Sequence, residues 1–342
     1  MAIGVAVLGT GRLGGRYIEI VKKTPGAQIK VVAEPRDEAA APWMDQHPDV
    51  DFVKDYKDAL ARDDVDVVVA TLPHWLHKQA AIDAANAGKH VYVEKPMAAW
   101  LADAREMMAA AKANNVKVMT AHTQRYFPVV KRMKQIVESG QLGQLLMAYD
   151  MWHKPYEPFG RPRWMLDRKL GGGMGQMDGT HEIDRLLWLI GYDVETVSAR
   201  VGQFTYPHDK HPEIAADDTA MCFIRWKSGI VATISRIAWE KGATEYGGDL
   251  FFTQGMARFR VAYGSSAGQR TAVWVADTPG GTWQLEEVDE TNQLLDEFSD
   301  FVAAIERGDK DTPIPQEHGI RVLEVLEATE ESSRTGREVI LG

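Results

Sequence analysis

Residues 3–14 of the chain read Ile3-Gly4-Val5-Ala6-Val7-Leu8-Gly9-Thr10-Gly11-Arg12-Leu13-Gly14, and this stretch decides the fold of the first part of the molecule. Its apolar start is typical of a buried strand, and the residues after the last glycine, through about Lys23, have the spacing of a helix. A G-x-G-x-x-G turn between a strand and a helix indicates a dinucleotide-binding unit when an acidic residue follows about twenty positions later. Glu34 stands in that position, at the end of a second apolar strand predicted at 31–33.

The three glycines each have a separate physical task in such a turn. Gly9 permits the tight turn, Gly11 lets the backbone approach a pyrophosphate, and Gly14 lets the helix pack on the sheet, with the phosphates at the positive N-terminus of the helix. Glu34 is expected to accept hydrogen bonds from ribose hydroxyls and to repel a 2′-phosphate, which favours NAD. Arg36, two residues later, could accommodate that phosphate, so NADP remains an alternative.

The rest of the first third continues to alternate between strands and helices. Residues 65–70 form a nearly continuous apolar run, which implies a strand buried on both faces of a parallel sheet. Further strands are predicted at 90–93 and 116–119, and helices at 77–87 and 101–114. This rhythm predicts an α/β fold that begins with a Rossmann domain, a doubly wound parallel sheet, over residues 1–122.

A different pattern begins after residue 122. Helices are predicted at 129–139 and after a glycine run within 171–189. Strand character recurs at 145–152, 196–204, 219–226, 230–239, 249–253, 258–263 and 272–276. Because strands follow one another with few helices between them, we expect a C-terminal α+β domain with a largely antiparallel open sheet over residues 123–342. The chain closes with helical stretches at 292–307 and 316–335, and the final helix is expected to pack back on the first domain.

Composition and charge exclude several classes of protein. Of the 342 residues, 45% are apolar and 26% are charged, which fits a folded two-domain protein and argues against intrinsic disorder. The net charge of −10 has the wrong sign for binding a nucleic-acid backbone. Cys222 is the one cysteine, so neither an intrachain disulfide nor a cysteine cluster for zinc can form. With no apolar run near about 18 residues and no leader before the first strand, we expect a cytoplasmic protein without a membrane partner.

Several further motifs follow the glycine turn in order along the chain. They are Ala70-Thr71-Leu72-Pro73-His74-Trp75-Leu76-His77, Ala87-Gly88-Lys89-His90-Val91-Tyr92-Val93-Glu94-Lys95-Pro96, Gly140-Gln141-Leu142-Gly143, Gly171-Gly172-Gly173 followed by His181 and Asp184, and Ser333-Arg334-Thr335-Gly336-Arg337. Together they resemble the Gfo/Idh/MocA oxidoreductase family, the group of glucose-fructose oxidoreductase and inositol dehydrogenase. The resemblance spans essentially the whole chain, and the ordered set is far more specific than any single motif.

The resemblance implies cofactor contacts beyond the glycines and the Glu34 region. They would come from Arg12, Leu13, Thr71, Pro73, His77, Glu94 and Lys95. Glu94-Lys95-Pro96 ends a strand at the carboxyl edge of the sheet, where an open α/β fold places its ligand. From the local sequence alone, Lys95 could equally be a surface lysine in a turn, with Pro96 opening a helix. The resemblance implies that the lysine of this motif orients substrate and stabilises negative charge on the reacting oxygen.

His181 is the candidate general base. An unperturbed histidine pKa of about 6.5 suits proton removal near neutral pH better than a lysine pKa of about 10.4. In a regular helix, Asp178 and Asp184 would lie near the same face as His181. The family pattern places an aspartate four positions before the histidine, where this chain has Met177, so either Asp178 or Asp184 could support His181.

A cluster of aromatic and polar residues precedes the glycine run, namely Trp152, His153, Tyr156, Arg163 and Trp164. Rigid aromatic faces with polar neighbours suit a sugar or polyol ring. The resemblance adds Arg125 and Tyr126, and Lys95, Asp178 and His181 complete the predicted substrate site. His181 and its neighbouring carboxylates are also acceptable metal ligands, but their spacing matches no zinc motif and the resemblance implies no catalytic metal.

These observations predict an NAD(P)-dependent oxidoreductase that transfers a hydride to or from a sugar, sugar derivative or cyclitol, with Lys95, His181 and Asp178 as catalytic residues. One alternative is an NAD-dependent glycoside hydrolase, which oxidises its substrate transiently and regenerates its cofactor. The other is a nucleotide-sensing regulator that has the fold without the chemistry. The resemblance also suggests a homodimer or homotetramer packed through the sheets of the second domain. The sequence specifies neither the sugar, nor the oxidised carbon, nor the direction of reaction.

Overall fold

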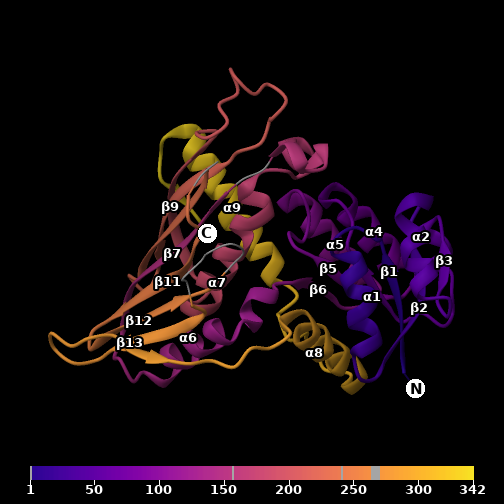
Figure 1. Ribbon diagram of the computed structural model, residues 1–342, viewed down its shortest axis with the longest axis horizontal. Helices are drawn as coiled ribbons and strands as arrows, with labels where there is room; N and C mark the ends of the chain where they lie inside the picture. The colour runs from indigo at the N-terminus through magenta and orange to yellow at the C-terminus, as the bar shows by residue number, and fades with distance from the viewer. Residues whose placement is uncertain (1, 156–157, 240–241, 263–269) are drawn as a thin grey trace. The chain divides into compact units, whose positions relative to one another are not determined.

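The computed structural model describes residues 2–155, 158–239, 242–262 and 270–342, which form two compact units (Figure 1). Unit 1 consists of Met1–Thr123 with Asn292–Ile320, and unit 2 of Gln124–Thr291 with Arg321–Gly342. A late segment of the chain therefore belongs to the first unit. It contains α8 (Gln293–Arg307), whereas most of the final helix, α9 (His318–Thr335), lies in unit 2.

Unit 1 contains a sheet of six strands whose paired neighbours are all parallel. The strands are β1 (Ile3–Leu8), β2 (Ala27–Ala33), β3 (Asp51–Val53), β4 (Val67–Ala70), β5 (His90–Glu94) and β6 (Val118–Ala121). Their order, β3-β2-β1-β4-β5-β6, reverses direction between β1 and β4. Doubly wound sheets bind ligands beyond the carboxyl ends of their strands at such a switch point. The predicted Rossmann fold is confirmed.

Helices connect the strands of unit 1. They are α1 (Gly14–Lys23), α2 (Asp37–Gln46), α3 (Tyr56–Leu60), α4 (His74–Asn86) and α5 (Leu101–Ala113). All four residues of β4 are buried, as its continuous apolar run predicts. Helix α8 packs on α1, and its Phe298 ring lies edge-on to the rings of Tyr17 and Tyr92. No helix among the described residues is long and apolar enough to cross a membrane.

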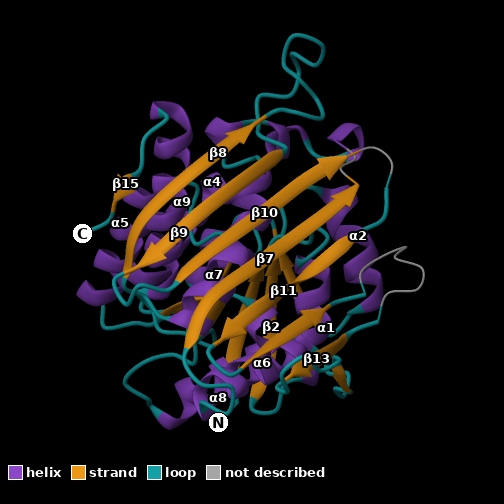
Figure 2. Cartoon of the chain, turned by 90° about the vertical axis from the view of Figure 1, so that its left-hand side faces the viewer, coloured by secondary structure: helices purple, strands orange, loops and turns teal. Residues whose placement is uncertain are grey.

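Unit 2 contains a sheet of nine strands in the order β14-β13-β12-β11-β7-β10-β9-β8-β15 (Figure 2). The strands are β7 (Leu145–Pro155), β8 (Val194–Gly202), β9 (Thr219–Trp226), β10 (Val231–Trp239), β11 (Glu245–Phe252), β12 (Gly255–Arg260), β13 (Ala272–Ala276), β14 (Gln284–Glu286) and β15 (Val339–Ile340). The pair β7 and β10 is parallel, and the other pairs of neighbours are antiparallel. The predicted, largely antiparallel sheet is confirmed.

Helices cover one face of this sheet and leave the other open. Helices α6 (Pro128–Ser139), α7 (Thr180–Ile190) and α9 lie on one side in Figure 1, and Figure 2 looks onto the opposite face. Strand β12 lies three residues earlier than the predicted 258–263, because Phe252 pairs with Gly255 across a two-residue hairpin. Tyr263, the last residue of that prediction, falls outside the described residues.

Candidate active site

The first group of candidate site residues lies in unit 1, at the glycine turn between β1 and α1. Gly9 has a φ of +89°, a left-handed conformation that favours glycine. A Cβ atom on Gly14 would lie 1.9 Å from the carbonyl oxygen of Gly9, so only glycine lets α1 begin this close to the turn. A Cβ on Gly11 would meet no atom within 4 Å, and Arg12 beside it is exposed while Leu13 is half-buried. The turn therefore fits a dinucleotide, with open space for a pyrophosphate at the N-terminus of a helix.

Glu34 follows β2 and faces the glycine turn. Its carboxylate accepts hydrogen bonds from the backbone N–H of Thr10 at 2.9 Å and from Nε of Arg36 at 2.8 Å. Burial alone raises the pKa of Glu34, but the hydrogen bonds from Arg36 and Thr10 outweigh burial and lower the pKa to about 2. The side chain of Glu34 is 2% exposed and that of Arg36 is 59% exposed. Glu34 is therefore an anion inside the unit, and its cationic partner reaches solvent.

Thr71 joins the end of β4 to the glycine turn. Its Oγ1 lies 2.9 Å from the carbonyl oxygen of Leu8 and 3.2 Å from that of Gly9. Pro73 then precedes the first residue of α4. These contacts place Thr71 and Pro73 at the switch point of the sheet.

His77 lies inside unit 1 and is fully buried. Its Nδ1 is 2.9 Å from the carbonyl oxygen of Pro96, and its Nε2 is 2.8 Å from that of Leu72. Burial lowers the pKa of His77, which favours the neutral ring. The side chain therefore joins the segments that follow β4 and β5, and none of it reaches the surface.

Glu94 is the last residue of β5, and the half-buried Lys95 follows it. The carboxyl group of Glu94 lies 2.9 Å from the hydroxyl of Tyr17 and accepts the backbone N–H of Lys95 at 3.2 Å. Burial raises the pKa of Glu94, although the charge of Lys95 and the contact with Tyr17 oppose the rise. The peptide bond between Lys95 and Pro96 is cis. Lys95 thus begins at the carboxyl edge of the parallel sheet.

A second group of candidate site residues lies in unit 2, after the glycine run. Gly171 and Gly173 have φ of +79° and +103°, and residues 175–179 form a turn of π-helix that continues directly into α7. Such turns interrupt α-helices frequently at functional sites. The turn carries Asp178, which is 8% exposed, and α7 begins with His181 in its first turn at 7% exposed. Both side chains are therefore placed by an irregular helix start that the glycines permit.

Asp178 belongs to a set of four charged side chains, Lys154, Asp178, Glu182 and Arg236, which we call the charged cluster. Oδ2 of Asp178 accepts hydrogen bonds from Lys154 and from Arg236, each at 2.6 Å, and Arg236 also donates to Glu182 at 2.8 Å. Burial lowers the pKa of Lys154 to about 8 despite Asp178. Burial also raises the pKa of Glu182 to about 7, against the charge of Arg236. The charged cluster therefore contains two basic and two acidic side chains in direct contact, in a largely buried environment.

Trp152 packs against the charged cluster. The guanidinium of Arg236 lies 4.7 Å from the centroid of the Trp152 ring, and Nζ of Lys154 lies 4.3 Å from it. The ring of Tyr246 stacks on Trp152 at 4.6 Å, and the ring of His181 lies 6.4 Å away. Trp152 is 4% exposed, so its ring is covered by cations and by another aromatic ring.

Two buried ion pairs fix α7. Asp184 accepts a hydrogen bond from Nε of Arg125 at 2.7 Å, and Arg125 lies in a short 3₁₀ turn before α6. Burial lowers the pKa of Arg125, but the charges and hydrogen bonds of Asp184 and Tyr192 together outweigh burial and raise it. Arg185 donates to Asp150 of β7 at 2.6 Å. These pairs hold α7 and its first turn, with His181, against the sheet.

Strand alternation separates two residues that the sequence groups together. Trp152 and Lys154 face α7 from β7, whereas His153 lies on the opposite face of the sheet. There, Nε2 of His153 is 2.8 Å from Oγ of Ser235. The structure therefore does not bring His153 together with His181.

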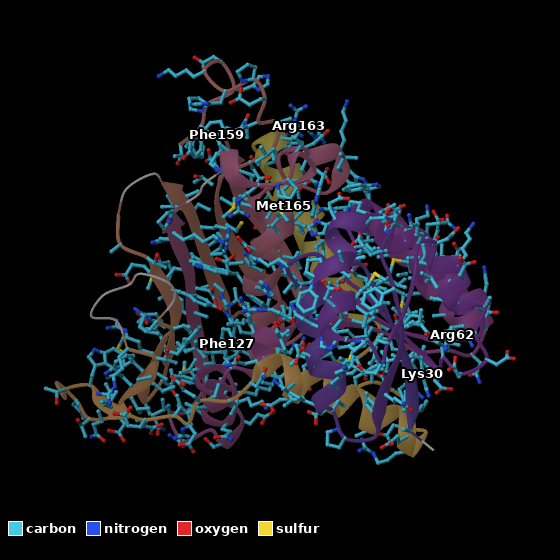
Figure 3. All side chains as sticks on the ribbon, turned by 45° about the vertical axis from the view of Figure 1, so that its right-hand side comes forward. Lys30, Arg62, Phe127, Phe159, Arg163 and Met165 are labelled. Carbon is cyan, nitrogen blue, oxygen red and sulfur yellow. The ribbon has the colours of Figure 1, made fainter. Side chains whose placement is uncertain are left out.

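The remaining predicted substrate residues are scattered. Arg163 is exposed in a short 3₁₀ turn at the outer end of unit 2, in the same part of the chain as Phe159 (Figure 3). Trp164, beside it, is half-buried. Tyr126 is buried, with Nζ of Lys131 4.4 Å from its ring centroid. Tyr156 falls outside the described residues.

Sequence reasoning did not single out Lys154 and Arg236. Both follow from strand register, because Lys154 is two residues after Trp152 and Arg236 pairs with Trp152 across β10 and β7. In the predicted strand at 230–239, Ala232 and Ile234 alternate toward the core, and Arg236 occupies the next inward position. A charged residue at an inward position of a predicted strand was the signal available.

Comparison with known proteins assigns both units to one family. Residues 3–122 match the oxidoreductase family GFO_IDH_MocA, described as an NAD-binding Rossmann fold. Residues 130–258 match the GFO/IDH/MocA C-terminal domain.

Individual relatives share about a quarter of their aligned residues with this chain. The chain is 24% identical over 338 residues to the uncharacterized oxidoreductase YrbE of Bacillus subtilis, a match that covers 98% of this chain and 96% of that protein. It is 27% identical over 200 residues to inositol 2-dehydrogenase of Salmonella typhimurium, which covers 58% of this chain and 57% of the relative. Among solved structures, levoglucosan dehydrogenase in complex with NADH has a TM-score of 0.87 at 22% identity, over 100% of both chains. At 22% identity, the similarity to levoglucosan dehydrogenase shows a shared fold only.

Proposed function

Because the chain belongs to the GFO/IDH/MocA oxidoreductase family, we propose that it is an NAD(P)-dependent dehydrogenase or reductase acting on a CH–OH group, or the matching carbonyl, of a sugar, sugar derivative or cyclitol. The observation that carries the proposal is the start of α7, where His181 lies beside Trp152 and the charged cluster. The glycine turn of unit 1 supplies a fitting place for the dinucleotide. The inositol dehydrogenase relative supports a polyol substrate.

His181 and Lys95 divide the chemistry at the reacting oxygen. The glycine turn and Glu34 would hold NAD, which would supply a hydride acceptor for the carbon that bears the hydroxyl group, or a hydride donor in the reverse direction. His181 takes the proton of that hydroxyl group on a ring nitrogen, as a general base that operates near neutral pH. The ammonium group of Lys95 donates a hydrogen bond to the same oxygen and stabilises its developing negative charge.

The charged cluster orients the substrate and the base. Arg236 is fully buried and holds Asp178 and Glu182, so these three groups form a fixed frame. The side chain of Lys154 is 13% exposed, and an ammonium group has three donors, so it can bond a substrate hydroxyl besides Asp178. Trp152 fixes the two cations through its ring. Substrate recognition at this point is therefore by hydrogen bonding to hydroxyl groups.

NAD is the preferred cofactor in this proposal. Glu34 remains ionised at every physiological pH because its pKa is lowered to about 2. A buried anion at the end of β2 accepts ribose hydroxyls and repels a 2′-phosphate. Arg36 opposes this preference, but its guanidinium already donates to Glu34.

A homo-oligomer completes the proposal. Figure 2 looks onto the open face of the unit 2 sheet. This face carries exposed apolar side chains, among them Met147, Met221 and Phe223 at 42%, 56% and 43% exposure. Soluble proteins rarely leave such patches uncovered. We expect two copies to pack through these sheets, which light scattering after size-exclusion chromatography tests, and a monomer would contradict it.

The function is tested with a panel of sugars, inositols and glycosides, each assayed at the absorbance of reduced nicotinamide with NAD and with NADP. Continuous reduction of NAD by a polyol or sugar supports the proposal. Cleavage of a glycoside without net reduction of NAD would instead identify a glycoside hydrolase. Tight binding of NAD without turnover of any compound would identify a nucleotide-sensing regulator.

A further inference from the structure

Inside unit 1, two tyrosine hydroxyls and two glutamate carboxyl groups form a continuous row of hydrogen-bond contacts that ends at Glu94, the residue before Lys95. The hydroxyl of Tyr17 on α1 lies 2.9 Å from Oε1 of Glu94 and 3.1 Å from the hydroxyl of Tyr92 on β5. The Tyr92 hydroxyl lies 2.8 Å from Oε2 of Glu297 on α8. We call Glu94, Tyr17, Tyr92 and Glu297 the phenol chain. It links the helix that follows the glycine turn to the residue before Lys95.

The phenol chain has more contacts than its phenols have hydrogens. It contains three oxygen–oxygen contacts of hydrogen-bond length, and each phenol supplies one hydrogen. If both carboxyl groups were ionised, each phenol would donate to its own carboxylate, because bonds to ions are the stronger ones. The two phenol oxygens would then face each other at 3.1 Å with no hydrogen between them. One additional proton closes all three contacts.

We propose that the phenol chain holds this additional proton and that Glu94 carries it as a neutral carboxylic acid, which makes Glu94 a positioning residue for Lys95. Glu94 then donates to Tyr17, Tyr17 to Tyr92, and Tyr92 to Glu297. Every phenol donates once and accepts once. Glu297 is the anionic end of the chain.

The two ends of the chain differ in how well they stabilise a negative charge. Oε1 of Glu297 accepts the backbone N–H of His122 at 2.7 Å, whereas Oε2 of Glu94 accepts the N–H of Lys95 at 3.2 Å. The shorter bond favours an ionised Glu297, because a backbone N–H stabilises the charged form.

The surroundings of Glu94 also favour its neutral form. Glu94 is 6% exposed, and the rings of Phe298 and Phe301 lie 5.2 and 5.5 Å from the ring of Tyr92. Burial raises the pKa of Glu94. Lys95, through its charge, and Tyr17, through its contact with the carboxyl group, act on the pKa of Glu94 against burial.

A neutral Glu94 has a consequence for Lys95 that rests on the proposed function. An ionised Glu94 would compete with the developing oxyanion for the ammonium group of its neighbour. A protonated Glu94 leaves that charge for the substrate oxygen, while its acceptor bond still holds the Lys95 backbone. The phenol chain thereby fixes where Lys95 begins without neutralising it.

Infrared difference spectroscopy on the full-length protein at neutral pH tests the proposal directly. The wild type minus Glu94→Gln spectrum should show the carbonyl stretch of a protonated carboxylic acid, with a shift in D₂O, and the wild type minus Glu297→Gln spectrum should not. Tyr17→Phe should move this band, and Tyr56→Phe should leave it in place, because Tyr56 bonds Asp83 elsewhere in the same unit at 2.6 Å. Absence of the band, or its loss only in Glu297→Gln, would overturn the proposal.

Thermal unfolding of the two glutamine variants gives a second measure, independent of catalysis. A neutral glutamine at 94 can donate to Tyr17 as the acid does, so its melting temperature should stay near that of the wild type. A glutamine at 297 has one carbonyl oxygen for two donors, Tyr92 and His122, so it should melt several degrees lower. If Glu94→Gln melted at a lower temperature than Glu297→Gln, the additional proton would lie on Glu297. If no substrate is found, these results still decide the question.

Discussion

The candidate site residues of unit 1 and those of unit 2 are arranged in opposite ways. In unit 1, the glycine turn works through its backbone and through the absence of side chains, and it lies within a dozen consecutive residues. In unit 2, the charged cluster works through side chains that come from two strands and a helix start, with Arg236 and Asp178 separated by 58 positions. The first group is therefore sensitive to added atoms. The second is sensitive to lost charges, because each removal leaves a buried partner uncompensated.

The largest effect is expected at Arg236. Arg236→Met removes the guanidinium that bonds both Asp178 and Glu182, and breaking buried pairs in this way costs about 3–5 kcal/mol of stability. Urea unfolding followed by circular dichroism measures the loss.

The matched control for Arg236 is Arg62→Met, at the surface of unit 1 (Figure 3). Arg62 also binds two carboxylates, those of Asp51 and Asp64, but these are 67% and 47% exposed. Its loss should cost at most about 1 kcal/mol. If the two substitutions lowered the free energy of unfolding equally, the ion pairs of the charged cluster would contribute no more to stability than those at the surface.

The second-largest effect is expected at Lys95 and His181, whose removal should reduce catalysis without reducing cofactor binding. Lys95→Ala and His181→Ala should each lower turnover by at least about a hundredfold, roughly 3 kcal/mol, because each removes a group that acts on the reacting oxygen. The affinity for NAD, measured by calorimetry, should change little, since the glycine turn and Glu34 supply the main contacts.

Two controls match this pair of substitutions. Lys30→Ala removes a lysine of unit 1 that donates to Gln28, and His153→Ala removes a histidine on the far face of the unit 2 sheet. Both should keep turnover near the wild-type value. Near-normal turnover of Lys95→Ala or His181→Ala would remove that residue from the mechanism.

The same contrast explains what the sequence could predict. The parallel sheet and the glycine turn follow from consecutive residues, since the apolar run, the glycine spacing and Glu34 lie within one βαβ unit. The charged cluster depends on the register of β10 against β7, which places Arg236 beside Trp152, and no local pattern specifies that register. The same alternation puts His153 on the opposite face. The only sequence signal for the π-helical turn at 175–179 is a pair of glycines, Gly175 and Gly179, which weaken a regular helix.

A smaller effect concerns the choice of cofactor in unit 1. Glu34→Ser removes the anion at the ribose and should weaken the preference for NAD over NADP by about tenfold, the equivalent of one charged hydrogen bond. Arg36→Ala keeps the anion and removes the cation that could receive a 2′-phosphate, so the preference for NAD should rise. Titration of both variants with both cofactors measures this. A clear NADP preference of the wild type would overturn the role of Glu34.

The smallest expected change separates Asp178 from Asp184. Asp178 holds Lys154, whose pKa is lowered to about 8 although Asp178 raises it, so Asp178→Asn should lower that pKa further. Lys154 would then lose its proton at a lower pH, and the alkaline limb of the profile of kcat/KM should move to lower pH. If Asp178 also stabilises a protonated His181, the acidic limb should move to lower pH as well, because the base takes up its proton less readily. Asp184→Asn removes the carboxylate charge that pairs with the buried Arg125, so it should reduce stability and leave both limbs in place. A pH profile that is unchanged in Asp178→Asn and shifted in Asp184→Asn would transfer the supporting role to Asp184, and with it the link between the charged cluster and the base.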